Sequence, residues 1–150
     1  MHAENARHEI QFGFVERPAH RSRTYDKDRF EVCNHRYTAL CDEGHGAAVL
    51  NDGKYGISVE DGCMELTLMR AAASPQMRAD NGIQEFTYAF YAWEGSFREG
   101  EAVRQGYELN VRPVVRPGRP AGQDGPMSFG IGKKNILLDT MKPAEDAAGI

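Results

Sequence analysis

Apolar and polar side chains alternate along most of the chain with a period of two. Because successive side chains of an extended strand point to opposite faces, residues two apart share a face. The alternation predicts six strands, whose shared apolar faces are Ile10, Phe12 and Phe14; Phe30 and Val32; Tyr55, Ile57 and Val59; Met64, Leu66 and Leu68; Phe86, Tyr88 and Phe90; and Ile136 and Leu138. β-Branched and aromatic residues are frequent in these runs, as is typical of a pleated, half-buried surface.

Turn-forming residues separate several of these runs. Asn51-Asp52-Gly53 and Glu60-Asp61-Gly62 each end in a glycine, which adopts a positive φ without steric cost. Both triplets therefore predict hairpin turns. Asp80-Asn81-Gly82 precedes the run that begins at Phe86 and predicts a third turn.

Two further segments depart from the strand pattern. Residues 101–109 predict the one short helix, because Val103 and Tyr107 lie one helical turn apart. Residues 113–125 are rich in proline and glycine and predict a loop. We therefore expect a single all-β domain over residues 1–150, an antiparallel β-sandwich of about eight to ten strands with at most one short helix.

The composition excludes several classes of protein. The chain has 150 residues, a net charge of -4, 41% hydrophobic and 27% charged residues, which excludes a disordered or fibrous chain. Because both signs of charge are interspersed, we expect neither nucleic acid nor an anionic membrane as a partner. No apolar run approaches the roughly 20 residues that cross a bilayer, and the first residues resemble no signal peptide. We expect a cytoplasmic protein with its three cysteines reduced.

Motifs for metal, nucleotide or nucleophilic chemistry are weak. Cys33 and His35, two apart on one strand, are the sharpest metal candidate together with Cys41 and His45, but their spacing matches no standard zinc module. Residues 128–134 contain two glycines and two lysines but lack the phosphate-loop spacing. No Gly-x-Ser-x-Gly motif is present. We therefore assign no catalytic residue and no metal ligand in this chain.

Arg70 and a group of aromatic residues remain as candidates for ligand contact. Arg70 ends the Met64–Leu68 face, so its guanidinium must lie at the end of the sheet, pair with a carboxylate or meet a polar ligand. Aromatic faces suit the C–H faces of sugars, but they also build sandwich cores. The aromatic residues that follow Asp80 are open to both interpretations; they are Tyr88, Tyr91, Trp93 and Phe97.

Six blocks in order along the chain resemble glycoside hydrolase family 38, the α-mannosidases. Residues 8–18 resemble the family's "E-I-P-F-G-x-x-E-R-P" segment, and residues 46–56 resemble "G-V-A-L-L-N-D-x-K-Y-G". The other four blocks are residues 30–37, similar to "F-E-V-x-x-H-R-W"; 65–70, similar to "L-R-L-S-L-L-R"; 80–89, similar to "A-D-x-G-x-H-x-F-T-Y-A-L"; and 135–146, similar to "N-V-V-L-E-T-V-K-x-A-E-D". Two departures are that Gln84 replaces the family's usual His, and Ala92-Trp93 its usual Pro-His.

The resemblance implies which part of such an enzyme this chain represents. In the family, the zinc ion and the carboxylate nucleophile belong to an N-terminal α/β domain, whereas the matched blocks belong to the β-sandwich region related to the galactose-mutarotase-like supersandwich. The chain is thus expected to be the β-sandwich portion of a zinc-dependent, retaining α-mannosidase that hydrolyses α-mannosides of glycans, with the catalytic domain absent. A stand-alone carbohydrate-binding module and a purely structural sandwich domain are the alternatives.

Further expectations follow from this assignment. Arg70 aligns with an arginine of the family's "L-x-L-x-R" strand and Asp80 opens the next turn, so both are predicted to reach the rim of the sugar site. The chain alone is expected to hydrolyse no mannoside and to hold no catalytic zinc, because its five His include no His-x-Asp pair. Strands that lack their partners leave an unpaired edge, which predicts a homodimer.

Overall fold

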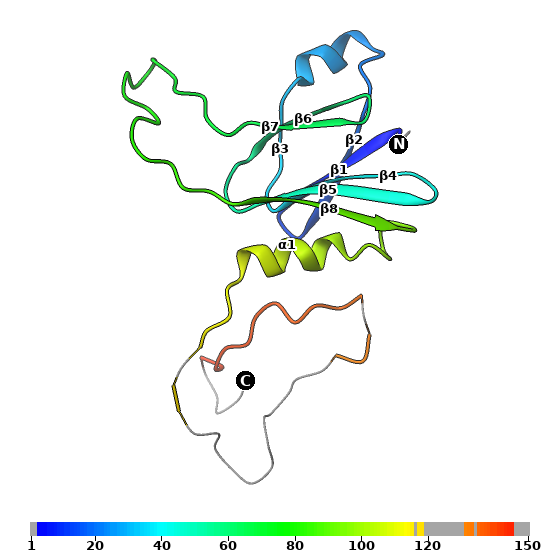
Figure 1. Ribbon diagram of the computed structural model, residues 1–150, viewed down its shortest axis with the longest axis vertical. Coiled ribbons are helices and arrows are strands. Elements are labelled where there is room, and N and C mark those ends of the chain that lie inside the picture. Colours follow the sequence, from blue (N-terminus) through cyan, green and yellow to red (C-terminus); the bar gives the residue numbers. More distant parts are fainter. Residues whose placement is uncertain (1–2, 116, 119–130, 134, 146–150) are drawn as a thin grey trace. The chain divides into compact units, whose positions relative to one another are not determined.

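The computed structural model describes residues 3–115, 117–118, 131–133 and 135–145. The chain divides into two compact units, Met1–Arg112 and Pro113–Ile150, and the first contains every described helix and strand (Figure 1). The predicted loop at 113–125 lies in the second unit, mostly outside the described residues. A single domain over 1–150 stays a prediction.

Within the described residues, eight strands form two antiparallel sheets, which confirms the all-β sandwich. The five-stranded sheet has the order β2-β1-β4-β5-β8 and the three-stranded sheet the order β3-β6-β7. The strands are β1 (Asn5–Ile10), β2 (Gly13–Pro18), β3 (Val32–Cys33), β4 (Tyr37–Cys41), β5 (His45–Asn51), β6 (Gly56–Glu60), β7 (Cys63–Leu66) and β8 (Tyr88–Glu94).

The two faces of the five-stranded sheet bury different cores. On one face, Tyr37, Ala39, Ala48 and Leu50 pack against Ala102 of the helix α1 (Ala102–Asn110). On the other face, the buried residues Ala6, Ala19 and Leu40 pack with Val59 and Met64 of the three-stranded sheet. The sheet therefore lies between α1 and the smaller sheet (Figure 1).

The helix follows the prediction closely, since α1 covers Ala102–Asn110 where 101–109 was expected. Gly106 lowers helix propensity, yet it is buried where α1 meets β4. A Cβ at this position would lie 3.4 Å from both Arg36 Cβ and Tyr37 Cδ1. The helix therefore packs closely against the start of β4 at this glycine. A short 3-10 helix, η1 (Thr24–Arg29), was not predicted.

A buried ion pair joins the sheet to this helix. Glu9 on β1 is 3% exposed and accepts hydrogen bonds from the Arg36 backbone N–H (2.7 Å), Nε (3.0 Å) and Nη2 (2.7 Å). The Arg36 guanidinium lies 3.6 Å from the centre of the Tyr107 ring on α1. Strand β1, the start of β4 and the helix are therefore held together at one point.

The predicted first strand, with Ile10, Phe12 and Phe14 on one face, is wrong. The chain turns at Gln11 and Phe12, and Ile10 pairs with Gly13 across the hairpin of β1 and β2. Phe12 has a φ of 61° and is fully exposed. Alternation continues through a two-residue turn, so the pattern alone does not reveal the reversal.

The predicted hairpin at Asn51-Asp52-Gly53 is also wrong, because β5 and β6 belong to different sheets. Asn51 makes this crossing: its buried side chain donates to Asn34 Oδ1 (2.9 Å) and the His35 carbonyl (2.8 Å), and accepts from the Lys54 N–H (2.8 Å). The hairpin predicted at Glu60-Asp61-Gly62 is confirmed, and it joins β6 to β7 with positive φ at Asp61 and Gly62.

Other predicted strands begin or end elsewhere. β7 ends at Leu66, so Leu68 and Arg70 lie beyond it, and β8 begins at Tyr88, so Phe86 precedes it. Phe30 follows η1 outside any strand. Residues 135–145 contain no strand, so the one predicted around Ile136 and Leu138 is wrong.

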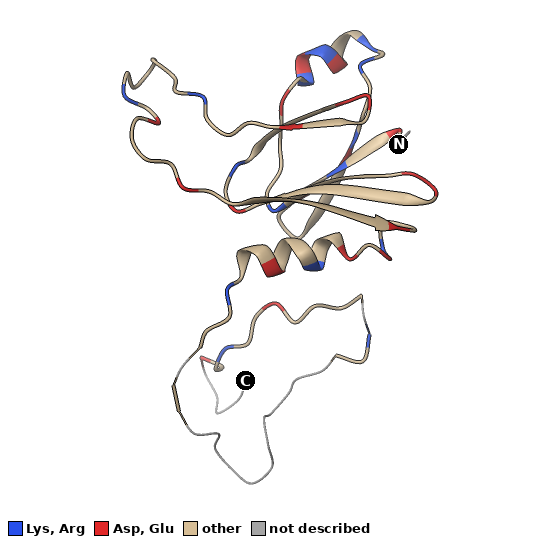
Figure 2. Ribbon diagram, in the orientation of Figure 1, with Lys and Arg blue, Asp and Glu red and all other residues tan. Residues whose placement is uncertain are grey.

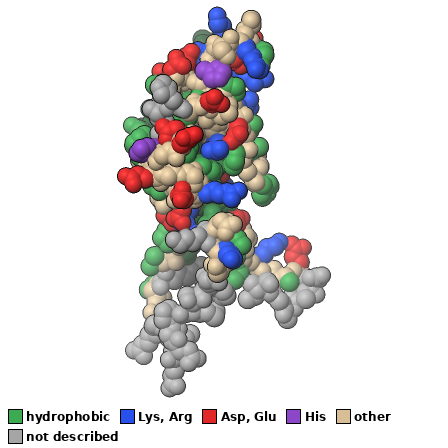
Figure 3. Space-filling model, turned by 90° about the vertical axis from the view of Figure 1, so that its right-hand side faces the viewer, with side chains coloured by type: hydrophobic (Ala, Val, Ile, Leu, Met, Phe, Trp, Pro, Cys, Tyr) green, Lys and Arg blue, Asp and Glu red, His purple; other side chains and the backbone are tan. Residues whose placement is uncertain are grey.

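Surface charge is mixed in sign. Acidic and basic residues are interspersed along the strands and η1 (Figure 2), and hydrophobic side chains lie among charged ones on the face shown in Figure 3. Within the described part of the chain, no helix has the length and apolar character needed to span a membrane.

Candidate functional site

Both candidate substrate-binding residues lie in the long connection between β7 and β8, residues 67–87, which we call the β7–β8 loop. In Figure 1 this loop extends away from both sheets. Residues 68–78 are exposed without interruption. Side chains here are therefore free to meet a ligand or another part of a larger protein.

Arg70 pairs with a carboxylate from another element. Its Nη1 atom lies 3.4 Å from Glu31 Oε2, just before β3. The Glu31 side chain is only 19% exposed and also accepts a hydrogen bond from the Thr67 hydroxyl, whereas the Arg70 side chain remains 69% exposed. The ion pair orients a guanidinium that is still open to solvent, so the pairing and ligand-contact interpretations are compatible.

Asp80 closes the loop beside Arg70. Its Oδ2 atom accepts the N–H of Ala71 at 3.0 Å, and its carbonyl accepts from Gln84 Nε2 at 3.5 Å. The residue has a φ of 61°, a conformation that Asp tolerates better than most side chains. The structure thus brings Asp80 to the residue next to Arg70. Arg70 and Asp80 form no ion pair with each other, since Arg70 pairs with Glu31.

Asp52 anchors the far end of the loop. Its Oδ1 atom accepts the N–H of Thr87 at 2.8 Å, and this hydrogen bond lowers the pKa of the Asp52 carboxyl. The Thr87 carbonyl in turn accepts the N–H of Asp52 at 3.1 Å. Because Asp52 follows Asn51 at the crossing between the sheets, the loop is tied to a rigid part of the fold.

The aromatic residues near the loop divide between surface and core. Phe86 and Tyr88 stack with ring centres 6.3 Å apart, and the Lys54 ammonium lies 4.8 Å from the Phe86 ring centre. Tyr88 and Phe90 share the face of β8 that points away from α1, and they are 59% and 72% exposed. They form an aromatic strip that a flat apolar face could contact.

The other predicted aromatic residues have packing roles. Tyr91, Trp93 and Phe97 pack against the core on the α1 side of the sheet. The Trp93 ring lies between Gly46 and Gly100, where a Cβ on either glycine would overlap it. Trp93 Nε1 donates to the Ser96 carbonyl at 3.0 Å. Trp93 is therefore a partly buried residue that packs against the core.

The residues of the strongest candidate for a metal site belong to both sheets and do not lie on one. Cys33 belongs to β3 in the small sheet, while Cys41 and His45 belong to β4 and β5 in the large one. Among the described residues no three His, Cys, Asp or Glu side chains are grouped so that they could hold a metal ion. The nucleotide-loop candidate at 128–134 lies mostly outside the described residues.

Glu31, the partner of Arg70, was not predicted from the sequence. Its side chain meets Arg70 only because β3 and β7 flank β6 in the small sheet. No local pattern signals this pairing, since the two residues are far apart in the chain.

Several known proteins are similar to this chain in sequence. The family model "Glycosyl hydrolases family 38 C-terminal domain" matches residues 1–78. The chain is 38% identical over 148 residues to "Alpha-mannosidase 2C1" of Homo sapiens and 36% identical over 157 residues to "Alpha-mannosidase G" of Dictyostelium discoideum. The alignments cover 98% and 97% of this chain, but this chain spans only 14% of the length of each relative.

A solved structure shares the fold. An α-mannosidase from Enterococcus faecalis superimposes with a TM-score of 0.58 at 18% sequence identity, covering 71% of this chain and 13% of the other. This likeness supports the sandwich architecture.

Proposed function

Because the chain belongs to glycosyl hydrolase family 38, as part of its C-terminal domain, we propose that it is the β-sandwich portion of a zinc-dependent, retaining α-mannosidase. The complete protein would hydrolyse α-mannosides of glycans, and this chain would line or support the sugar site without supplying a catalytic group. The family match together with α-mannosidase relatives along nearly the whole chain supports this proposal most directly.

The β7–β8 loop is the part of the chain that we assign to the sugar site. Arg70 offers an exposed guanidinium held by Glu31, and Asp80 holds the neighbouring backbone. A guanidinium donates to sugar hydroxyls through several N–H groups, and charge-assisted hydrogen bonds are the stronger ones.

Zinc would be bound outside this chain. The described residues do not fit the ion, because no three potential ligands converge among them, whereas zinc needs three or four at about 2.0–2.3 Å. Retaining hydrolysis also needs two carboxyl groups about 5–5.5 Å apart across the scissile bond. We assign both requirements to the rest of the polypeptide.

Kinetics of the complete protein test the role of the loop. With an aryl α-mannoside, Arg70→Ala is expected to lower kcat/KM by about tenfold, the loss of one charge-assisted hydrogen bond. Arg78→Ala removes an exposed arginine of the same loop and should leave kcat/KM unchanged.

A Glu31→Gln variant separates binding from scaffolding, because it removes the ion pair and keeps the guanidinium. Glu31→Gln should lower kcat/KM by less than Arg70→Ala does. Unchanged kinetics in Arg70→Ala, or equal losses in both variants, would assign Arg70 a structural role only.

The chain by itself provides a second test. Purified residues 1–150 should release no aryl group from an α-mannoside even with added Zn²⁺. Turnover that co-purifies with the chain and disappears with a chelator would contradict the non-catalytic role.

The aromatic strip favours one alternative, a carbohydrate-binding module. Tyr88 and Phe90 are exposed on one face of an edge strand, an arrangement suited to stacking on a sugar. This alternative predicts saturable mannoside binding by the chain that Phe90→Ala weakens, and an unrelated coding region beside it. An adjoining region with a His-x-Asp zinc pair favours the enzyme.

A further inference from the structure

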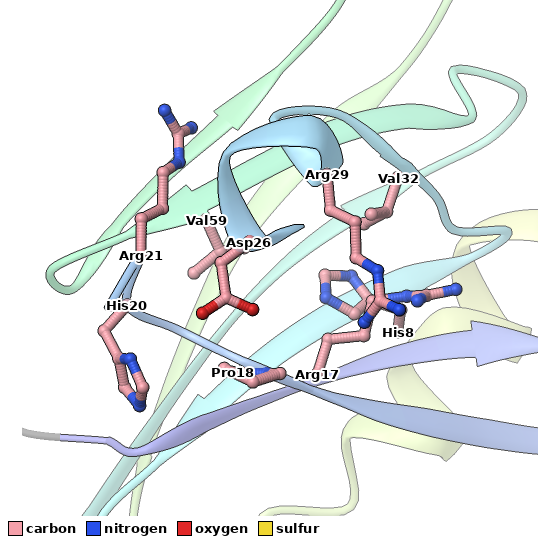
Figure 4. A pocket seen from close by; sticks show the side chains of 9 residues that line it. All are labelled: His8, Arg17, Pro18, His20, Arg21, Asp26, Arg29, Val32 and Val59. Atoms are coloured by element: carbon pink, nitrogen blue, oxygen red, sulfur yellow. The ribbon is translucent and has the colours of Figure 1, made fainter. Parts of the chain in front are cut away.

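A basic pocket lies beside η1, at a place that shares no residue with the β7–β8 loop. It has a volume of about 30 Å³, and its polar lining residues are His8, Arg17, His20, Arg21, Asp26 and Arg29 (Figure 4). They come from β1, β2, the segment after β2 and η1. The polar lining thus holds three guanidinium groups against one carboxylate.

One guanidinium group and the carboxylate already have partners within the described part of the chain. Arg21 Nη1 lies 3.2 Å from Glu60 Oε2, so this arginine has its own partner. The Asp26 carboxylate accepts the backbone N–H of Arg23 at 2.8 Å and stabilises the start of η1. Asp26 is therefore partly committed to the backbone.

Arg17 and Arg29 keep unbalanced positive charge at the pocket. Neither forms an ion pair with a carboxylate within the described part of the chain, although Arg29 lies 5.4 Å from the Tyr25 ring centre. The Arg17 Nε atom is buried and makes no hydrogen bond there. An unpaired buried donor on a charged group is costly, so a partner that accepts from it would be stabilising.

His8 lines this pocket, and its pKa is lowered there. The side chain is 1% exposed, and its Nδ1 atom lies 3.0 Å from Thr38 Oγ1. Burial, and next the positive charge of Arg17, lower its pKa to about 4. The imidazole is thus neutral near pH 7 and adds nothing to the positive charge of Arg17 and Arg29, which exceeds the single negative charge of Asp26.

From this arrangement we propose that the pocket binds an oxyanion: a phosphate, or the carboxylate of a small solute. Guanidinium groups match the oxygens of both anions, and donate to them through paired N–H groups. A volume of about 30 Å³ exceeds the roughly 10–15 Å³ that one water needs, which suits a small group rather than an extended ligand. The site is independent of the mannosidase proposal.

Calorimetric titration of the protein that carries this chain tests the proposal. Inorganic phosphate in a Tris chloride buffer should bind saturably at one site, and acetate in the same buffer distinguishes a carboxylate site from a phosphate site. Arg17→Gln and Arg29→Gln should each weaken binding about tenfold, because each removes a charge-assisted donor.

Arg98→Gln is the matched control, since it removes the same charge from an exposed residue outside the pocket and should change the affinity by less than about twofold. Arg29 is exposed, so its variant keeps the test valid if Arg17→Gln does not fold. The proposal is overturned if neither anion binds saturably. That result is expected if a carboxylate of the same polypeptide already pairs with Arg17. It is also overturned if all three variants bind alike.

Discussion

Individual ion pairs in this protein differ mainly in burial. Glu9 and Arg36 meet where the carboxylate is almost fully buried, whereas Arg7 and Glu16 meet at the surface with side chains 29% and 45% exposed. Removing one partner of a buried pair leaves the other charge unpaired in the protein interior, whereas water solvates an exposed charge that loses its partner.

Glu9→Gln should therefore lower the free energy of unfolding by about 2–3 kcal/mol, since Arg36 is itself partly exposed. The matched change Glu16→Gln should cost about 0–1 kcal/mol. Urea denaturation of both variants measures the difference. Equal losses would show that burial does not determine the strength of these pairs.

A single buried histidine should make stability depend on pH. The pKa of His8 is about 4 in the folded protein, and about 6.5 is expected when the chain is unfolded. Between these values the unfolded state binds more protons, so stability is complete above about pH 6.5 and is lost as the pH falls toward 4. The loss through this one group should be about 2–3 kcal/mol.

Urea titrations at pH 7 and pH 5 check this expectation. His8→Gln should lose less stability over that interval than the parent protein, whereas His20→Gln, at an exposed position, should follow the parent. A His8→Gln variant with the parent's full pH dependence would assign the effect to other groups.

At the scale of elements, the packing of β8 against β5 involves a slot that holds the ring of Trp93. Trp93 lies between Gly46 on β5 and Gly100 just before α1. The glycines are buried, and the ring fills the space that their missing side chains leave. The slot therefore links β8, the neighbouring strand β5 and the segment that leads into α1.

Gly46→Ala should lower the free energy of unfolding by about 1–3 kcal/mol, because the added methyl overlaps the Trp93 ring and forces it to move. Gly44→Ala, in the turn between β4 and β5, meets nothing within 4 Å and should change stability by less than about 0.5 kcal/mol. Thermal melts of the two variants compare them directly. Equal melting temperatures would mean that the ring moves at no cost.

For the whole molecule, the open question is what covers the edges of its sheets. β8 is an edge strand of the large sheet, and its outward face exposes Tyr88 and Phe90. Unpaired edges and exposed aromatic side chains favour association. We expect two copies of the isolated chain to form a homodimer through this edge.

Sedimentation at several concentrations tests the homodimer. Phe90→Glu should shift the chain toward monomer, because it places a charge in the apolar contact. Phe12→Glu, in the turn of β1 and β2 at the opposite side of the large sheet, should leave association unchanged. A clean monomer at high concentration would contradict the expectation.

Much of the fold could be predicted from local pattern. Alternation located Ile57 and Val59 on β6, the Asp61-Gly62 turn and the helix at Ala102–Asn110, because these features depend on neighbouring residues only. The same pattern extended strands too far at Leu68 and Arg70, where no neighbouring strand offers hydrogen bonds.

The candidate site was less predictable. The sequence placed Arg70 and Asp80 together in one region, and the structure joins them through the N–H of Ala71. Glu31 could not have been predicted, because its contact with Arg70 requires the strand order β3-β6-β7.

The class of fold and the family could be inferred from sequence alone, because alternation, turn residues and ordered motifs each consist of residues close together in the chain. Three features became visible only in the folded chain: Asn51 begins a crossing between sheets, Trp93 fills a slot, and Arg17 lines a basic pocket. Each of these depends on residues far apart in the chain that packing brings within a few ångströms. Sheet order and burial decide such contacts, and a local pattern contains neither.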